Sequence, residues 1–249
     1  SSLIEGESII RNAAMEPEII SLAEMLNKMG AKIKGYGTSK IVIKGCSKLK
    51  GTDITIPSDR IEAGTFALAV TATGGKLKLK SINIKEIETL KNVLQNTDVE
   101  IKSLENSIEI IKKNKIIHPT DIETKPYPGF PTDLQAQFMA LMAYSNGKSK
   151  IKETIFENRF MHVQELVRLG AKIKLNSDTA IVNGVKKLYG APLMATDLRA
   201  SASLIIGALR AEGTSTIRRV YHLDRGFDKI EQKLSSCGAI IERKRDNNE

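Results

Sequence analysis

The chain has 249 residues, a formal net charge of +9 at pH 7, few aromatic residues and no Trp. A chain of this length can bury one large or two modest hydrophobic cores. The few aromatic residues do not indicate a surface on which nucleic-acid bases stack, and most basic residues are Lys spread along strand-like stretches such as 74–85. We therefore expect no nucleic-acid partner. The charge is typical of a solvated Lys-rich surface, with attraction of small anionic substrates as the alternative.

Cysteine content and hydropathy indicate the cellular compartment in which the protein works. Cys46 and Cys237 lie outside any disulfide or metal-ligand motif, which indicates a reducing environment. No apolar run approaches the length of a membrane span, and the first ten residues have no signal-peptide character. The sequence therefore predicts a cytoplasmic protein without a membrane partner.

The N-terminal part predicts half of a repeated unit. Residues 16–43 are typical of a helix that begins at Pro17, followed by a pair of strands. The helix that opens each later unit is not found before them. We expect the chain to begin inside a repeat whose first part is absent.

A short phrase then occurs three times, with Asp59, Asp133 and Asp197 each heading a stretch of small and apolar residues. Each stretch is typical of a helix that stops near a Gly, and a strand and a second amphipathic helix follow it. Strand pairs come next, for example the hairpin expected at 171–185. The phrase returns at intervals of roughly 65–75 residues, which predicts an α/β repeat rather than a short-period solenoid.

The residues that head the helices suggest either caps or an anion site. Each of the three Asp residues is a candidate helix N-cap, because a short acidic side chain accepts hydrogen bonds from free backbone N–H groups. Arg60 and Arg199 closely follow their Asp, whereas the middle copy has Gln135, so the units are not equivalent. Arg159 and Arg225 precede second helices, at turns where α/β folds often contact ligands. Solvated Arg side chains and an anion held by guanidinium and helix N–H groups both remain open.

The remaining reactive side chains give weak signals. His162 and His222 are not at a spacing that holds a metal ion, so we expect no metal site. Cys46 follows a Gly in a hairpin-like stretch without a nearby base. This setting favours a small packed residue over a nucleophile.

Four longer stretches resemble the enolpyruvyl transferases. They are YPGFPTDLQAQFMAL at 127–141, ETIFENRFMHVQELVRLGAKI at 153–173, MATDLRASASLI at 194–205 and YHLDRGFDKIEQKLSSCGAIIERK at 221–244. The similarity runs from the first residues to about residue 245. Within the family, FPTDLQAQF and ENRFMHV favour the branch whose substrates are UDP-N-acetylglucosamine and phosphoenolpyruvate over the shikimate-pathway branch.

The resemblance implies an inside-out α/β repeat fold of six βαβαββ-type units, three in each of two domains, with the active site in the cleft between them. About three and a half units would be present. Residues 1–57 would end the first domain, and 58–249 would form the second. The family's catalytic Cys loop and its phosphoenolpyruvate-binding Lys would lie in a missing N-terminal segment, since neither Cys here corresponds to the catalytic one. We therefore expect this chain alone to be inactive.

The resemblance also implies site residues. Asp133 would contact the sugar 3-hydroxyl and act as the base, and Arg225 would be a second catalytic residue. Ile155 would lie at the uridine nucleotide, and Arg199 would face phosphate or carboxylate, as would Arg225. The full set of substrate-binding residues that it implies is Asp133, Ile155, Arg159, Asp197, Leu198, Arg199 and Arg225.

The implied reaction adds the sugar 3-hydroxyl to C2 of phosphoenolpyruvate, protonates C3 and then eliminates phosphate, without a metal or organic cofactor. It would be the first committed step of peptidoglycan synthesis, and so part of cell-wall formation, cell shape and cell division. Two alternatives remain open. The chain could belong to the shikimate-pathway branch, or it could be a non-catalytic truncated homologue.

Overall fold

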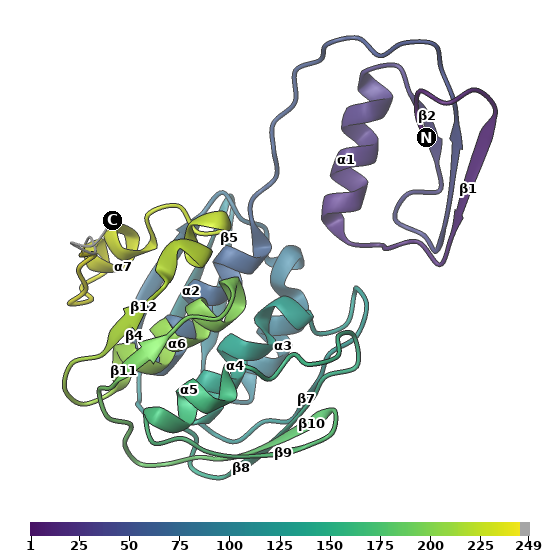
Figure 1. Ribbon diagram of the computed structural model, residues 1–249. Coiled ribbons are helices and arrows are strands. Elements are labelled where there is room, and N and C mark those ends of the chain that lie inside the picture. The colour runs from purple at the N-terminus through teal and green to yellow at the C-terminus, as the bar shows by residue number, and fades with distance from the viewer. Residues whose placement is uncertain (245–249) are drawn as a thin grey trace. The chain divides into compact units, whose positions relative to one another are not determined.

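The computed structural model describes residues 1–244. These residues divide into two compact units, the first with one helix and one sheet and the second with several helices and three sheets (Figure 1). The first unit comprises Ser1–Asp59 together with Lys125–Pro131, and the second comprises Arg60–Thr124 and the chain from Thr132 onward.

The first unit is one helix on a small antiparallel sheet. Strands β1 (Glu7–Arg11), β2 (Lys32–Lys34) and β3 (Lys40–Lys44) form a sheet in the order β1-β3-β2. Helix α1 (Pro17–Lys28) begins at Pro17 as predicted, because a missing N–H costs nothing in the first helical turn. Alternate strand residues and the helix share a small core of Ala23, Ala31, Ile33, Ile41 and Ile43.

Three almost fully buried helices form the centre of the second unit. They are α2 (Arg60–Thr73), α4 (Gln135–Met142) and α6 (Leu198–Arg210), which correspond to the three predicted Asp-headed helices. All eight residues of α4 are buried; six are apolar or small, as expected of a helix enclosed on every side, and two are the polar Gln135 and Gln137. The close packing uses Gly64 on α2, where an added Cβ would lie 2.6 Å from Leu134 Cδ1. Tyr144, just after α4, donates a 2.7 Å hydrogen bond to the Gly207 carbonyl of α6.

Three sheets and smaller helices surround these central helices (Figure 1). The first sheet has the order β4-β6-β5, with β4 (Gly75–Lys80), β5 (Glu100–Leu104) and β6 (Ser107–Lys112). The second has the order β7-β8-β10-β9, with β7 (Ile122–Glu123), β8 (Lys148–Lys152), β9 (Lys172–Asn176) and β10 (Thr179–Asn183). The third pairs β11 (Pro192–Met194) with β12 (Thr216–Arg218). The outer helices are α3 (Glu88–Gln95), α5 (Val163–Arg168) and α7 (Ile230–Ser236), with 3-10 turns η1 (Ile84–Ile87), η2 (Thr132–Leu134) and η3 (Val220–Arg225).

The element order confirms the predicted α/β repeat. The middle unit runs β7-α4-β8-α5-β9-β10, in which β7 is parallel to β8 and the last two strands form the hairpin expected at 171–185. The last unit repeats the first four elements as β11-α6-β12-α7, again with a parallel strand pair. Helix α4 ends at Met142, before the Gly147 at which we expected it to stop, because residues 143–145 close with turn hydrogen bonds instead.

Candidate active site

Asp133 lies in the 3-10 turn η2, immediately before α4. Gln137, one helical turn on, donates a 2.9 Å hydrogen bond to the Asp133 carbonyl and a 3.3 Å bond to Thr65 Oγ1 on α2. Leu134 occupies the N-cap position of α4 without a side-chain cap bond, so the prediction of an N-cap at Asp133 is wrong. The 3-10 turn displaces the Asp from the capping position, and its carboxylate is available for other partners.

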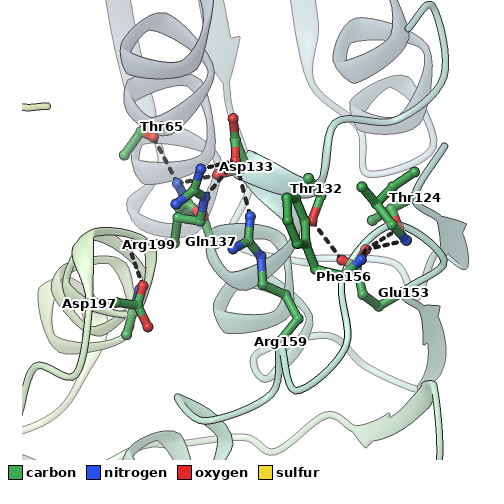
Figure 2. A network of polar contacts seen from close by, with 12 residues as sticks. Thr65, Thr124, Thr132, Asp133, Gln137, Glu153, Phe156, Arg159, Asp197 and Arg199 are labelled. Carbon is green, nitrogen blue, oxygen red and sulfur yellow. Dashed lines mark hydrogen bonds and ion pairs between the residues drawn. The ribbon is translucent and has the colours of Figure 1, made fainter. Parts of the chain in front are cut away.

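Those partners are two arginines from distant parts of the chain (Figure 2). Arg159 Nη2 lies 3.1 Å from Asp133 Oδ1, and Arg199 Nε lies 2.5 Å from the same oxygen. The Arg199 Nη2 group also contacts that oxygen. Two guanidinium groups thus contact one carboxylate oxygen, and the Glu153 and Asp197 carboxylates lie close enough to Arg159 to act on it electrostatically.

Burial makes the charge of Arg159 costly, and nearby carboxylates offset part of that cost. The pKa of Arg159 is lowered, first by removal of its side chain from water and then by the neighbouring Arg199, while the Asp133, Glu153 and Asp197 carboxylates oppose the shift. An anion placed between the two arginines would relieve both effects, since guanidinium groups bind carboxylate and phosphate in a fork geometry.

Asp197 caps helix α6, as the sequence predicted. Its Oδ1 accepts hydrogen bonds from the backbone N–H groups of Arg199 and Ala200, at 2.8 and 3.0 Å. Although burial acts to raise the pKa of this carboxyl, the hydrogen bonds from Ala200, Arg199 and Thr196 lower it overall. The cap fixes the first turn of α6 and, with it, the backbone from which Arg199 reaches Asp133.

Arg159 is held in place by contacts within its own loop, which follows strand β8. Its guanidinium carbon lies 4.6 Å from the centre of the Phe156 ring, within the range of a cation–π contact. The buried Glu153 carboxylate anchors the same loop through the backbone N–H groups of Ile155 and Phe156. In sequence Glu153 reads as one polar residue after a Lys-rich strand, so only its burial reveals it.

His162 is buried below this loop. Burial lowers its pKa to about 4, which keeps the ring neutral at physiological pH. Its ring lies close enough to Asp197 and Arg159 for both charges to act on it, Asp197 raising its pKa and the Arg159 charge lowering it. Among residues 1–244, no group of three or more His, Cys, Asp and Glu side chains gathers as a possible metal site.

The structure brings some of the other predicted residues close to this cluster and leaves one apart. Ile155 is 37% exposed beside Glu153, and Leu198 opens α6 next to the Asp197 cap. Arg225 ends η3 with an exposed side chain, and within residues 1–244 no ion pair or hydrogen bond joins it to Asp133. Cys46 is a free cysteine in the other compact unit, where its Sγ lies 3.3 Å from the Ser2 carbonyl.

Fold and site together define an α/β protein of repeated units in which a carboxylate is paired with two arginines. The sequence matches the family model described as EPSP synthase (3-phosphoshikimate 1-carboxyvinyltransferase) over residues 1–234. The chain therefore belongs to this family of enolpyruvyl transferases, as its motifs predicted.

Curated relatives and solved structures agree with this assignment. The chain is 56% identical to UDP-N-acetylglucosamine 1-carboxyvinyltransferase 1 of Mesorhizobium japonicum, over 98% of this chain and 56% of that protein. It is likewise 56% identical to the UDP-N-acetylglucosamine 1-carboxyvinyltransferase of Methylorubrum populi, over 98% of this chain and 57% of that one. The chain thus spans a little more than half the length of these relatives.

Among solved structures, the enolpyruvyl transferase NikO from Streptomyces tendae superposes with a TM-score of 0.86 at 26% identity, covering 96% of this chain and 57% of that chain. The EPSP synthase from Acinetobacter baumannii shares the fold, with a TM-score of 0.72 at 20% identity over 97% of this chain and 58% of its own. These likenesses confirm the predicted fold class. Separately, no helix in the described part of this chain is long and apolar enough to cross a membrane.

Proposed function

We propose that this chain is part of an enzyme that transfers the enolpyruvyl group of phosphoenolpyruvate to the 3-hydroxyl of UDP-N-acetylglucosamine and releases phosphate. The observation that carries the proposal is the pairing of the Asp133 carboxylate with Arg159 and Arg199. The site contains a proton acceptor beside two guanidinium groups, which bind anions in a fork geometry, and the substrates are multiply anionic. The names of the relatives at 54–56% identity support the choice of acceptor.

In this proposal the arginines bind charge and Asp133 moves a proton. Arg199 faces the phosphate or carboxylate of phosphoenolpyruvate, and Arg159 faces the other anionic groups in the site. Because both now contact Asp133, binding of these anions draws guanidinium groups away from it. The freed carboxylate accepts the proton of the sugar 3-hydroxyl as its oxygen attacks C2. Protonation at C3 gives a ketal phosphate, whose C2–O bond to phosphate breaks as the C3 proton leaves.

The remaining predicted residues complete the proposed site. Asp197 orders the first turn of α6, Leu198 lines it, and Ile155 contacts the uridine nucleotide. Arg225 reaches the phosphoenolpyruvate side by a movement of its exposed side chain. The residues of the chain's own site require no metal or organic cofactor in this scheme, because positioning and charge stabilisation carry the reaction.

The rest of the active site is proposed to come from an N-terminal segment of the same enzyme. Residues 1–57 would then end the first domain of that enzyme, and 58–249 would form the second. The chain alone is proposed to be inactive, because half of the cleft and the family's Cys loop would be missing from it. Such an enzyme would act in the cytoplasm, in peptidoglycan synthesis, and would therefore affect cell shape and division.

The runner-up is transfer of the same group to a shikimate derivative. The description of the matching family model names that activity, and the fold is shared with an EPSP synthase. The high identity to the UDP-sugar enzymes favours the first acceptor.

A phosphate-release assay tests the proposal. The chain joined to the N-terminal segment of the Mesorhizobium japonicum relative is mixed with phosphoenolpyruvate and either acceptor. We expect turnover of about 1–100 s⁻¹ with UDP-N-acetylglucosamine, the ordinary enzyme range, and none with shikimate 3-phosphate. Turnover with the shikimate compound only would favour the runner-up. Turnover by the chain alone would contradict the proposed need for the missing segment.

A further inference from the structure

A buried carboxylate next to the candidate site is satisfied by four hydrogen bonds. Glu153 is 3% exposed and lies directly after strand β8. Its Oε1 accepts bonds from Thr124 Oγ1 at 2.8 Å, from the Ile155 N–H at 2.9 Å and from the Phe156 N–H at 3.2 Å. Its Oε2 accepts a 2.8 Å bond from Thr132 Oγ1. A carboxylate in this environment costs free energy unless such donors surround it, so its contacts are specific.

The two oxygens of this carboxylate serve two different segments (Figure 2). Oε2 holds Thr132, the residue immediately before Asp133 in the turn η2. Oε1 holds the N–H groups of Ile155 and Phe156, and the Phe156 ring lies under the Arg159 guanidinium. One side chain therefore supports both partners of the Asp133–Arg159 ion pair, Asp133 through Thr132 and Arg159 through Phe156.

A further pair of hydrogen bonds reinforces the same junction. Thr124 Oγ1 accepts a 2.9 Å bond from the Thr154 N–H, and the Thr154 hydroxyl donates a 2.5 Å bond to the Thr124 carbonyl. The segment 153–156 is thus tied to the end of β7 on one side and to η2 on the other. A loop held in this way can place Arg159 with the accuracy that a transition state requires.

We infer that Glu153 is a positioning residue of the transfer reaction, which sets the place of Asp133 through Thr132 and the place of Arg159 through the loop 155–156. It does not itself contact substrate. This role rests on the proposed function, since its effect is on the reaction that Asp133 and Arg159 would carry out.

Substitutions can separate the hydrogen bond that Glu153 makes to Thr132 from the hydrogen bonds that it makes to the loop 155–156. Thr132→Val keeps the shape of the side chain and removes only the bond to Oε2, so the loop 155–156 stays held. We expect kcat to fall roughly tenfold because Asp133 loses its fixed position, a smaller loss than the roughly 10²–10⁴-fold expected when a positioned acid or base is removed. KM for UDP-N-acetylglucosamine should change less than about twofold, since the contacts that bind the substrate in the ground state are kept. Thr132→Ser restores the hydroxyl and should restore kcat.

Substitutions of Glu153 itself should affect both the bond to Thr132 and the bonds to the loop 155–156. Glu153→Gln retains an acceptor for the N–H groups and an amide that can bond a threonine oxygen, so it should keep most of the activity. Glu153→Ala removes all four bonds and should lower kcat and raise KM together. Thr97→Val is the control, because Thr97 is a buried threonine whose hydroxyl, like that of the partly buried Thr132, donates a hydrogen bond, here at 2.6 Å to the Leu94 carbonyl and outside this network.

The experiment compares these variants in the protein that is active in the phosphate-release assay, with Tm recorded for each. A loss of kcat in Thr132→Val that Thr132→Ser reverses, and that Thr97→Val with a similar fall in Tm does not share, supports the positioning role. Equal kcat in Thr132→Val, Thr97→Val and wild type overturns it while leaving the proposed function intact. An inactive wild-type protein overturns the proposed function and this role with it.

Discussion

Replacing Asp133 by Asn separates a catalytic carboxylate from a structural one. The change keeps the shape of the side chain and one acceptor oxygen but removes the negative charge between Arg159 and Arg199. The side chains of the three residues are 19–33% exposed, so solvent screens their attraction and each pair contributes about 0.5–1 kcal/mol at most. Because the amide oxygen still accepts one bond, we expect a loss of about 1 kcal/mol of stability, or a Tm lower by about 2–4 °C.

The activity of the same variant should fall far more than its stability. Without a proton acceptor at the sugar hydroxyl, we expect kcat to drop by about 10²–10⁴, as for loss of a general base. Phosphoenolpyruvate binding should persist, since the arginines remain and no longer face a competing carboxylate. Phosphate release and isothermal titration would measure the two effects, on the chain joined to the N-terminal segment of the Mesorhizobium japonicum relative.

Asp98→Asn is the matched control, because its carboxylate pairs with His118 at 3.1 Å outside the site. It should leave kcat unchanged. An Asp133→Asn enzyme whose kcat stays within about threefold of wild type would show that Asp133 is not the base, which would then have to be sought elsewhere.

Three further predictions concern the scaffold around the site. Asp197→Ala should destabilise the chain by about 1 kcal/mol through loss of the α6 cap, whereas Asp197→Asn should retain most of the stability; thermal unfolding compares the two. Tyr144→Phe should cost about 1 kcal/mol in urea unfolding, because it leaves the buried Gly207 carbonyl without its donor. The folded-state pKa of His162, about 4, lies below its unfolded value near 6.5, so the unfolded state binds more protons between these pH values. The free energy of unfolding should therefore fall by up to roughly 3 kcal/mol as pH drops through this window, and less in His162→Gln.

The repeat architecture could be predicted from sequence because its signals are local. Pro17 marks a helix start, the apolar stretches after Asp59, Asp133 and Asp197 mark the buried helices, and the turn at 171–185 marks a hairpin. Each depends on a few neighbouring residues. The same local logic identified the cap at Asp197 correctly and failed at Asp133, where a 3-10 turn intervenes.

The contacts of the candidate site could not be predicted from residue patterns alone. Arg199 and Asp133 are 66 residues apart in the chain, and Arg159 joins them from a third segment. Motif similarity named these three residues, but not the fact that they contact one another. No role was predicted for Glu153, because a single Glu after a strand is ordinary in sequence. Its burial and its four hydrogen-bond donors become visible only in the structure.

Identification of the reaction product tests the proposed enolpyruvyl transfer. The chain joined to the N-terminal segment of the Mesorhizobium japonicum relative is incubated with phosphoenolpyruvate and UDP-N-acetylglucosamine, and the mixture is analysed by NMR. We expect vinyl proton signals of an enolpyruvyl ether on the sugar 3-oxygen, formed in equal amount with inorganic phosphate. Unchanged UDP-N-acetylglucosamine, or phosphate released without the ether, would contradict the proposed transfer.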